Sequence, residues 1–354
     1  MHVPDGFIDA PISAATGVVA AGAIAVSLRG ARREQGGTSR ASEAERGGER
    51  TAPLAGLVAA FIFAVQMLNF PVAAGTSGHL LGGALAAILV GPYTGVLCVS
   101  VVLLMQGILF ADGGLTALGV NITDMAITTT VVAYAVFRGL VKILPRGRRS
   151  ITAASFTAAL LSVPAAALVF TLLYALGGTT DVSPGKVAGA MIGVHVLIGI
   201  GEAAITALTV GAVIAVRPDL VYGARGLEQR LKLRVNGELV DAAPESTPVR
   251  GTSHRKVWLT GLAASLLLAG FVSFYASSNP DGLEKVAADH GIDRAAEEHA
   301  SADSPLADYG VRDVEDARLS GGLAGVIGVG VTVVAGSGVF WAVRRRRDTA
   351  SQAA

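Results

Sequence analysis

The sequence predicts an all-α membrane protein: a polytopic helix bundle of about seven transmembrane helices, followed by a two-helix C-terminal module. Of its 354 residues, 52% are hydrophobic and 16% are charged, with a mean hydropathy of +0.57, whereas a soluble domain carries about 25% charged residues. From Leu54 to Ala111 there is no Asp, Glu, Lys or Arg, enough chain for several bilayer spans of about 20 residues each. The net charge of +1 does not point to nucleic acid, and we expect no such partner.

Nine apolar runs account for the predicted helices. They lie near residues 10–28, 53–71, 80–90, 93–110, 116–137, 151–176, 187–215, 257–275 and 321–343. The third run is short, and Gly91-Pro92-Tyr93 separates it from the fourth, because Gly and Pro interrupt regular helix. The single cysteine, Cys98, lies within the fourth run, so we expect neither an intramolecular disulfide nor a thiolate metal cluster.

The distribution of basic residues orients these runs in the bilayer. Clusters follow the first, fifth, seventh and ninth runs: Arg29, Arg32, Arg33, Arg40, Arg46 and Arg50; Arg138, Lys142, Arg146, Arg148 and Arg149; Arg217, Arg225, Arg230, Lys232 and Arg234; and Arg344 to Arg347. Counted alternately, all four clusters fall on one side, which the positive-inside rule assigns to the cytoplasm. We therefore expect an extracytoplasmic N-terminus. We also expect no cleaved signal peptide, because Asp5 and Asp9 precede the first run where a signal carries positive charge.

Met1 and His2 offer the parts of a metal chelate. The α-amine, the amide nitrogen of His2 and its imidazole Nδ1 can close two fused rings around one ion. Three nitrogens in a plane favour Ni(II) or Cu(II), with Co(II) possible if the geometry relaxes. A histidine at position 2 also occurs without any such role, so the rest of the chain has to decide.

His79 is a second candidate ligand. It lies between the second and third runs in a glycine-rich segment, on the same outer side as Met1. Glycines permit a tight non-helical loop, which is tolerated at membrane depth only when it is buried in protein or lines a cavity. The alternative is a loop histidine near the lipid headgroups. Two outward histidines in constrained Pro/Gly contexts favour one shared site.

These two segments resemble the signatures of a known family. Met1-His2-Val3-Pro4-Asp5-Gly6-Phe7 and Gly75-Thr76-Ser77-Gly78-His79-Leu80-Leu81-Gly82-Gly83 are similar to those of the membrane substrate-binding subunit of cobalt/nickel energy-coupling-factor ABC transporters. The resemblance covers about residues 1–216, and the opening residues look more like the nickel branch. It implies a multi-pass protein of the bacterial plasma membrane, with Ni(II) or Co(II) as transported substrate and no prosthetic group.

The resemblance also implies ligands and partners. The ion would be held in a square-planar set of nitrogens: the Met1 amine, the His2 amide and imidazole, and the His79 imidazole. The implied partners are energy-coupling ATPase subunits and a transmembrane coupling subunit.

Several polar residues are candidates for a supporting shell around the site. Gln66 and Asn69 lie three apart before Pro71, Asn121 and Asp124 repeat that spacing, and Ser77 adjoins His79. Such groups orient metal-bound imidazoles by accepting their other N–H. The alternative is hydrogen bonding between spans.

His195 and Glu202 lie seven apart in the seventh run. Ionisable residues within membrane spans are functional candidates by default. An acid–base pair and a second metal-handling step are both open, but interhelical contacts or an interface with the coupling subunit are favoured.

The chain divides into three parts. Residues 1–216 form the metal-binding permease bundle, 217–256 a polar cytoplasmic linker, and 257–354 a two-span accessory module. Pro280-Asp281-Gly282-Leu283-Glu284 in the outer loop of that module resembles the signature of a small accessory subunit of these permeases. Between Asp281 and Arg318 there are eleven acidic and four basic residues, and such a surface concentrates divalent cations. His290 and His299 lie there, but we expect no metal ligand from this module.

The sequence indicates no enzyme. It lacks a Gly-x-x-x-x-Gly-Lys-Ser/Thr phosphate loop, a His-Glu-x-x-His helix and a Gly-x-Ser-x-Gly elbow, so we expect the energy to come from separate ATPase subunits. Two alternative functions remain open. One is an intramembrane metalloenzyme using His195, Glu202 and His79, and the other is a metal sensor that signals through the linker.

Overall fold

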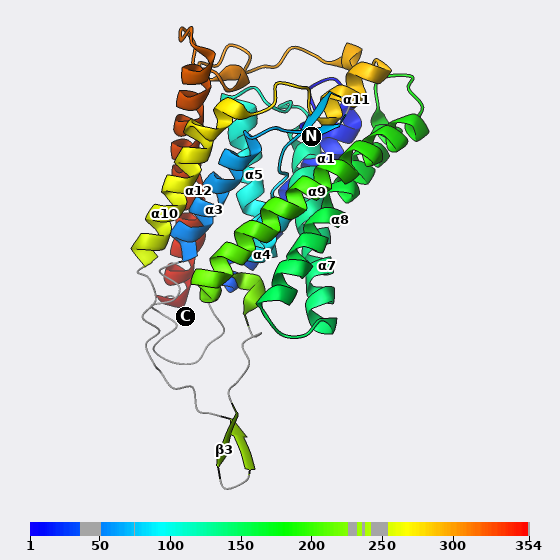
Figure 1. Cartoon of the computed structure of the whole chain (residues 1–354). Helices are drawn as coiled ribbons and strands as arrows, with labels where there is room; N and C mark the ends of the chain where they lie inside the picture. The colour runs from blue at the N-terminus through cyan, green and yellow to red at the C-terminus, as the bar shows by residue number, and fades with distance from the viewer. Residues whose placement is uncertain (36–50, 74, 226–231, 236–237, 242–253, 353–354) are drawn as a thin grey trace.

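Helices dominate the part of the chain that the computed structural model describes, which comprises residues 1–35, 51–73, 75–225, 232–235, 238–241 and 254–352. Within these residues, seven helices are long and apolar enough to cross a membrane. The predicted fold class, an all-α polytopic bundle, is confirmed. Figure 1 shows the helices side by side, with the N-terminus folded in among them at one end of the bundle.

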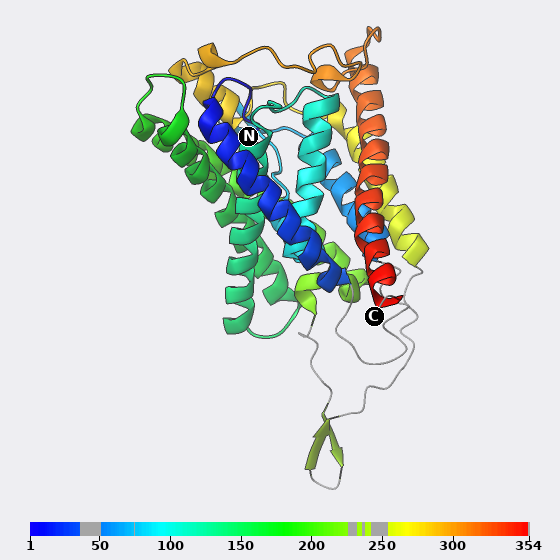
Figure 2. The same ribbon diagram turned by 180° about the vertical axis from the view of Figure 1, so that it is seen from behind.

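Five of the long helices belong to the N-terminal bundle. They are α1 (Ala10–Gln35), α5 (Pro92–Leu109), a continuous helix from Leu118 to Ile143 whose last part is α7 (Thr129–Ile143), α8 (Arg148–Gly177) and α9 (Pro184–Val216). Pro92 and Pro184 begin α5 and α9, where a missing N–H costs no hydrogen bond. In the view from behind, α1 runs obliquely across the bundle (Figure 2).

Two of the predicted spans are shorter than expected. Helix α3 (Thr51–Gln66) ends five residues before the predicted limit, and α4 (Gly83–Val90) has only eight residues. At 1.5 Å per residue α4 is about 12 Å long, so it cannot cross a bilayer core of about 30 Å. Seven of its eight residues are buried, and it packs against α3, α5, α7, α8 and α9. It is an interior helix, and the third span of the sequence analysis is corrected accordingly.

A β-hairpin fills the space between α3 and α4. Strand β1 (Phe70–Ala73) pairs antiparallel with β2 (Thr76–Gly78), with Phe70 opposite Gly78 and Pro71 opposite Ser77. The sequence predicted a tight non-helical loop here but not a hairpin. The hairpin leads directly to His79.

The helix that ends as α7 changes its winding partway. Residues Leu118–Asn121 (α6) are followed by a π-helical segment, Ile122–Thr128, before α7. Such segments are rare and often lie at functional sites. This one contains Asp124.

The C-terminal module packs on the bundle through α3. Helices α10 (His254–Gly270) and α12 (Ala317–Gln352) both contact α3 and each other. Small residues allow the approach: a methyl group on Gly325 would lie 2.3 Å from Ala269 O, and one on Gly328 would lie 2.2 Å from the ring of Phe63. Between the two helices, the outer loop contains α11 (Gly282–His290) and crosses the end of the bundle that holds the N-terminus (Figure 1).

Short elements complete the described chain. Single turns of 3₁₀-helix lie at Pro218–Leu220, Tyr222–Ala224, Val272–Tyr275, Asp293–Ala295 and Ala307–Tyr309. In the linker, β3 (Lys232–Val235) pairs with β4 (Glu238–Asp241), and the remainder of residues 226–253 lies outside the described residues, as do the predicted basic positions Arg40, Arg46 and Arg50.

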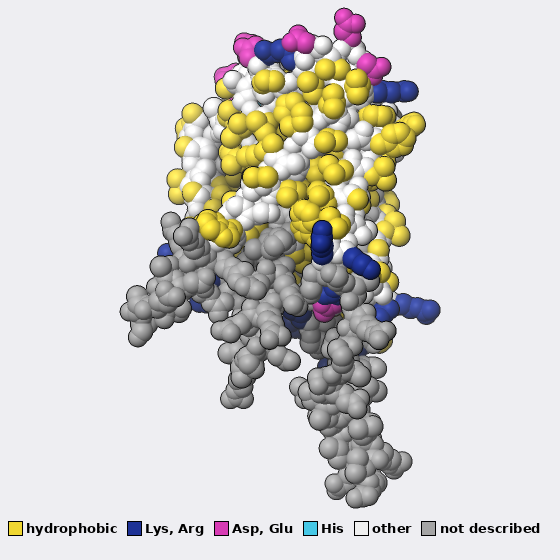
Figure 3. Space-filling view, turned by 90° about the vertical axis from the view of Figure 1, so that its left-hand side faces the viewer, with side chains coloured by type: hydrophobic (Ala, Val, Ile, Leu, Met, Phe, Trp, Pro, Cys, Tyr) yellow, Lys and Arg dark blue, Asp and Glu magenta, His cyan; other side chains and the backbone are white. Residues whose placement is uncertain are grey.

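Charge separates to the two ends of the molecule. In Figure 3 the carboxylates gather at the end that carries the outer loop, most Lys and Arg side chains lie toward the opposite end, and hydrophobic side chains cover the middle. This matches the charge pattern read from the sequence and places the N-terminus at the acidic end.

Candidate metal site

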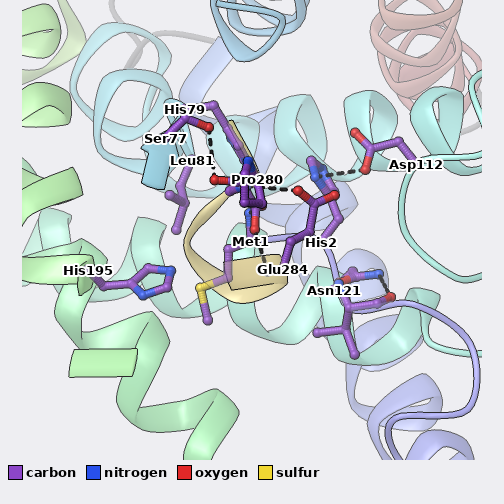
Figure 4. A network of polar contacts seen from close by, with 12 residues as sticks. Met1, His2, Ser77, His79, Leu81, Asp112, Asn121, His195, Pro280 and Glu284 are labelled. Carbon is purple, nitrogen blue, oxygen red and sulfur yellow. Dashed lines mark hydrogen bonds and ion pairs between the residues drawn. The ribbon is translucent and has the colours of Figure 1, made fainter. Parts of the chain in front are cut away.

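The amino group of Met1 is buried at the meeting point of the bundle and the C-terminal module. Met1 is 2% exposed. Its nitrogen lies 2.6 Å from Nε2 of His79 and 2.6 Å from Oδ2 of Asp281, and Figure 4 shows Met1, His2 and His79 close together. A primary amine, an imidazole and a carboxylate therefore share one small volume.

The two candidate histidines lie face to face. The rings of His2 and His79 stack with centroids 5.1 Å apart and an interplanar angle of 17°. Burial lowers the pKa of His2 to about 4, against the opposing attraction of Asp112, so its ring is neutral at neutral pH. A neutral imidazole has one nitrogen lone pair free to bind a metal.

His79 presents its Nε2 atom to the amine. Its Nδ1 atom lies 3.0 Å from Leu80 O, and a carbonyl oxygen only accepts hydrogen bonds. Nδ1 therefore carries the proton, and the lone pair of Nε2 is directed at Met1. A hydrogen bond from the other ring nitrogen to a backbone carbonyl commonly fixes the tautomer of metal-binding histidines.

Backbone contacts hold the N-terminal segment in place. The N–H of Val3 donates to Oδ1 of Asn121 at 2.7 Å, and Nδ2 of Asn121 donates to Val3 O at 3.1 Å. Asp5 then accepts hydrogen bonds from the backbone and hydroxyl of Thr116 at 2.8 and 2.5 Å. The turn ends at Gly6, whose φ of +89° suits glycine.

The segment that carries His79 is held from both sides. On one side, Ser77 donates from its N–H to Pro280 O at 2.8 Å and from its hydroxyl to Asn279 O at 2.7 Å. On the other side, Glu202 of α9 accepts from the N–H groups of Leu81 and Gly82 at 2.7 and 3.1 Å.

The candidates for a supporting shell have varied contacts. Asn121 holds Val3, Ser77 meets the C-terminal module, and Gln66 donates to Leu81 O at 3.0 Å. The side-chain oxygens of Asn69 and Asp124 have no hydrogen-bond partner among the described residues. The contacts to the imidazole of His2 come instead from two other residues.

Those residues, Gln106 and Asp112, were not singled out from the sequence. Gln106 Oε1 lies 3.1 Å from His2 Nε2, and Asp112 Oδ1 lies 3.1 Å from His2 Nδ1. Gln106 is one of the few polar residues in the long uncharged stretch, and Asp112 is the first charge after it. Those two facts are the signal that the sequence offered.

Asp281 brings the C-terminal module into contact with the site. The sequence predicted no metal ligand from that module and left its contact with the site open, and the structure shows that the carboxylate of Asp281 touches both Met1 and His79. Burial raises the pKa of Asp281, but the positive charge of the Met1 amine holds it well below its usual range. The module therefore contributes an ionised carboxylate beside the two candidate ligands.

The remaining histidines form no hydrogen bond or ion pair with Met1, His2 or His79 among the described residues. His195 Nδ1 lies 2.7 Å from Met191 O of its own helix, its Nε2 is buried without a hydrogen-bond partner among the described residues, and Figure 4 shows its ring on the side that faces Met1. His290 Nδ1 lies 2.9 Å from Val286 O, and His299 Nε2 lies 3.1 Å from Gly113 O. Glu202 contacts the backbone after His79, so the structure does not assemble His195, Glu202 and His79 into one set.

A cavity of about 640 Å³ opens beside His2 and His79. Its lining comes from both modules and includes four carboxylates, those of Asp112, Asp281, Glu284 and Asp308. A polar, negatively charged cavity of this kind attracts cations.

Comparisons with known proteins identify relatives of both modules. The family model described as the cobalt uptake substrate-specific transmembrane region matches residues 2–220, and the PDGLE domain model matches residues 255–345. The fused nickel transport protein NikMN of Rhodobacter capsulatus is 30% identical over 367 residues, covering 97% of this chain and 98% of the relative. The cobalt transport protein CbiM of Geobacter sulfurreducens is 32% identical over 301 residues, covering 82% and 79%.

Two solved structures resemble part of this chain. The crystal structure of a transition metal transporter is 25% identical, with a TM-score of 0.52, and covers 61% of this chain and 93% of its own. A truncated transition metal transporter gives a TM-score of 0.50 at the same identity.

Proposed function

We propose, from the premise that this chain belongs to the family of cobalt uptake substrate-specific transmembrane regions, that it captures single Ni(II) or Co(II) ions for an uptake transporter. Membership makes the chain a membrane component of nickel and cobalt transport. We further propose which ion it binds, which residues bind the ion and which subunits are its partners.

The observation that carries the proposal is the convergence of nitrogen donors at the buried N-terminus. The amine of Met1, Nε2 of His79 and the ring of His2 lie together. With the amide nitrogen of His2 they supply up to four nitrogens, the donor type that suits Ni(II) and Cu(II) and that cobalt also accepts. The ion is the transported substrate, so binding has to be reversible.

The approach of the ion follows from charge. The cavity beside His2 and His79 is lined by carboxylates of both modules, and the basic residues collect toward the other end of the molecule (Figure 3). By the positive-inside rule, we assign the acidic end to the outer face of the cell membrane. A divalent ion would then enter from outside, through the negative cavity, to the nitrogen donors.

We assign the release of the ion and the supply of energy for transport to other proteins. We assign ATP hydrolysis to separate ATPase subunits, and the transmission of its energy to a transmembrane coupling subunit that contacts the bundle. Relatives such as the fused nickel transport protein of Rhodobacter capsulatus support metal transport as the shared function.

An N-terminal extension tests the ligand assignment. Adding one glycine before Met1 moves the amine away from His79 and breaks the fused chelate rings. Equilibrium binding to purified full-length protein should show that Ni(II) affinity falls by orders of magnitude. One glycine added after Ala354 is the matched control. Unchanged Ni(II) affinity in a protein whose extended N-terminus has been verified would contradict the ligand assignment. A parallel titration with Co(II) identifies the preferred ion.

A further inference from the structure

A chain of hydrogen bonds connects Tyr309 of the C-terminal module to the imidazole of His2. The hydroxyl of Tyr309 donates to Oδ2 of Asp112 at 2.6 Å, and Nε2 of Gln106 donates to that hydroxyl at 2.9 Å. The other end of the same amide, Gln106 Oε1, lies 3.1 Å from His2 Nε2. Gln106 is fully buried, so water does not offer its amide an alternative partner.

The number of protons on the tyrosine hydroxyl fixes which group donates in each of these hydrogen bonds. A tyrosine hydroxyl has one proton, and here it goes to the carboxylate of Asp112. The hydroxyl oxygen can therefore only accept from Gln106, which sets the amide with its nitrogen toward Tyr309 and its oxygen toward His2. Because an amide oxygen only accepts, His2 must donate through Nε2.

This arrangement decides which nitrogen of His2 is free. A neutral imidazole carries one proton, so a proton on Nε2 leaves the lone pair on Nδ1. Nδ1 is the ring nitrogen that can close a chelate with the amide and amine of the N-terminus.

Asp112 favours the opposite tautomer. Its Oδ1 atom lies 3.1 Å from His2 Nδ1, and a carboxylate beside an imidazole nitrogen favours a proton there. A proton on Nδ1 would block the chelate. Tyr309 opposes this outcome twice, because its hydroxyl occupies the other oxygen of Asp112 and also orients Gln106.

We propose that Tyr309 is a positioning residue that acts through Gln106 to keep a proton of His2 on Nε2, so that Nδ1 is the nitrogen available to the metal. This inference rests on the proposed function of the same site. It assigns to the C-terminal module a chemical task, the choice of histidine tautomer, that is distinct from attracting cations. With a cation bound at Nδ1, the Asp112 carboxylate offsets part of its charge.

The placement of Tyr309 is strongly constrained. Its ring stacks on that of Phe110, with centroids 4.9 Å apart at 20°, and the N–H of Asp308 donates to Phe110 O at 2.9 Å. Asp308 and Tyr309 have φ values of +53° and +56°, a region that residues other than glycine rarely adopt. Two consecutive residues in that region persist only where surrounding contacts hold them.

Tyr309→Phe in the full-length protein tests the inference. The variant keeps the ring on Phe110 but loses the hydroxyl, so Gln106 is free to turn and Asp112 can draw the proton to Nδ1. In metal-free protein at neutral pH, ¹⁵N NMR of labelled histidine should show the His2 signal, identified by its loss in His2→Ala, changing from the Nε2–H to the Nδ1–H form. Ni(II) affinity should fall about 10- to 100-fold, as for other second-shell changes. Tyr134→Phe, which alters a tyrosine of α7 whose ring lies tilted against that of Tyr222, should change neither the His2 signal nor the Ni(II) affinity.

A second variant separates the tautomer from packing. In Tyr309→Phe combined with Asp112→Asn, the competing carboxylate is absent, so the Nε2–H form and most of the Ni(II) affinity should return. If charge alone governed binding, the double variant would bind Ni(II) more weakly than Tyr309→Phe, since removing a carboxylate weakens the attraction for a cation. Affinity lost in Tyr309→Phe with the Nε2–H signal unchanged, or no recovery in the double variant, overturns the inference. Failure of the wild-type protein to bind Ni(II), or full binding by His2→Ala, would instead overturn the proposed function.

Discussion

The carboxylate of Asp281 lies 2.6 Å from the amino group of Met1, although 280 positions separate these residues in the chain. Both partners are buried, with side chains 1% and 11% exposed. A cation bound by the amine has to displace one proton of the ammonium group, because that proton occupies the lone pair that binds the metal. The two remaining N–H groups can still donate to the carboxylate of Asp281. The C-terminal module therefore takes part in the site rather than only surrounding it.

The two histidines should behave as one site. His2→Ala and His79→Ala should each reduce Ni(II) affinity strongly, because each removes an imidazole from the stacked pair. The double variant should lose scarcely more than either single variant, since partners in one site are non-additive. Isothermal titration of the four proteins measures this, and additive losses would indicate two independent sites.

Glu202 should be needed to position His79. In Glu202→Gln, an amide nitrogen replaces one of the oxygens that accept from Leu81 and Gly82, which leaves a buried donor unpaired at a cost of about 1–3 kcal/mol. If half of that free energy is lost from metal binding because the loop is displaced, Ni(II) affinity drops by about 2- to 13-fold. The absorption spectrum of the Ni(II)-loaded protein should also shift as the nitrogen of His79 is lost.

Thr206→Val is the matched control for Glu202→Gln. Thr206 lies one turn further along α9, is fully buried, and its hydroxyl has no hydrogen-bond partner among the described residues. It should leave both affinity and spectrum unchanged. Equal effects of the two variants would mean that α9 responds to any buried change, and the assignment to Glu202 would fall.

Asn121 should keep the N-terminus in its buried position. Asn121→Ala removes both hydrogen bonds to Val3, so the segment before Pro4 should open more often. The rate at which an amine-directed acylating reagent modifies Met1 should rise, and Ni(II) affinity should fall. Thr171→Val is the control for a general loss of stability. Thr171 is buried in α8, and its hydroxyl donates to Ala167 O of the same helix. Unchanged labelling in Asn121→Ala would contradict this role.

Deleting the C-terminal module should change exchange of the metal more than its equilibrium binding. A chain that ends near Arg250 keeps Met1, His2 and His79, and the solved structures that match the bundle cover only 61% of this chain. It should still bind Ni(II), but release should be faster because Asp281 and its neighbours no longer cover the amine. Stopped-flow competition with a chelator measures release. Complete loss of binding by a well-folded truncation would make the module part of the ligand set.

Much of the fold was predictable because it depends on local composition. Runs of Ala, Val, Leu and Ile mark the spans, and Gly91-Pro92 marks the end of α4, since these signals act over a few residues. The hairpin at Phe70–Gly78 was not predicted, because Phe70 and Pro71 continue an apolar run that looks like the end of a helix. The eight-residue length of α4 follows from that hairpin.

The site was predictable only where its residues lie in recognisable segments. Met1, His2 and His79 were found because each stands in a distinctive local sequence. Asp281, Gln106 and Asp112 reach the site through tertiary contacts spanning more than 100 positions with His2 or Met1. A single sequence contains no local signal for such pairings, so their roles emerge only from the folded chain.

The buried ion pair between Met1 and Asp281 also has a consequence for biosynthesis. Residue 281 is synthesised after most of the bundle, so the carboxylate of Asp281 cannot contact the Met1 amine during most of translation. Any enzyme that trims or acylates a nascent N-terminus must act in that interval, because Met1 is 2% exposed once the chain is folded. The last part to be made thus closes over the first, and a prematurely terminated chain presents an open amine to its surroundings.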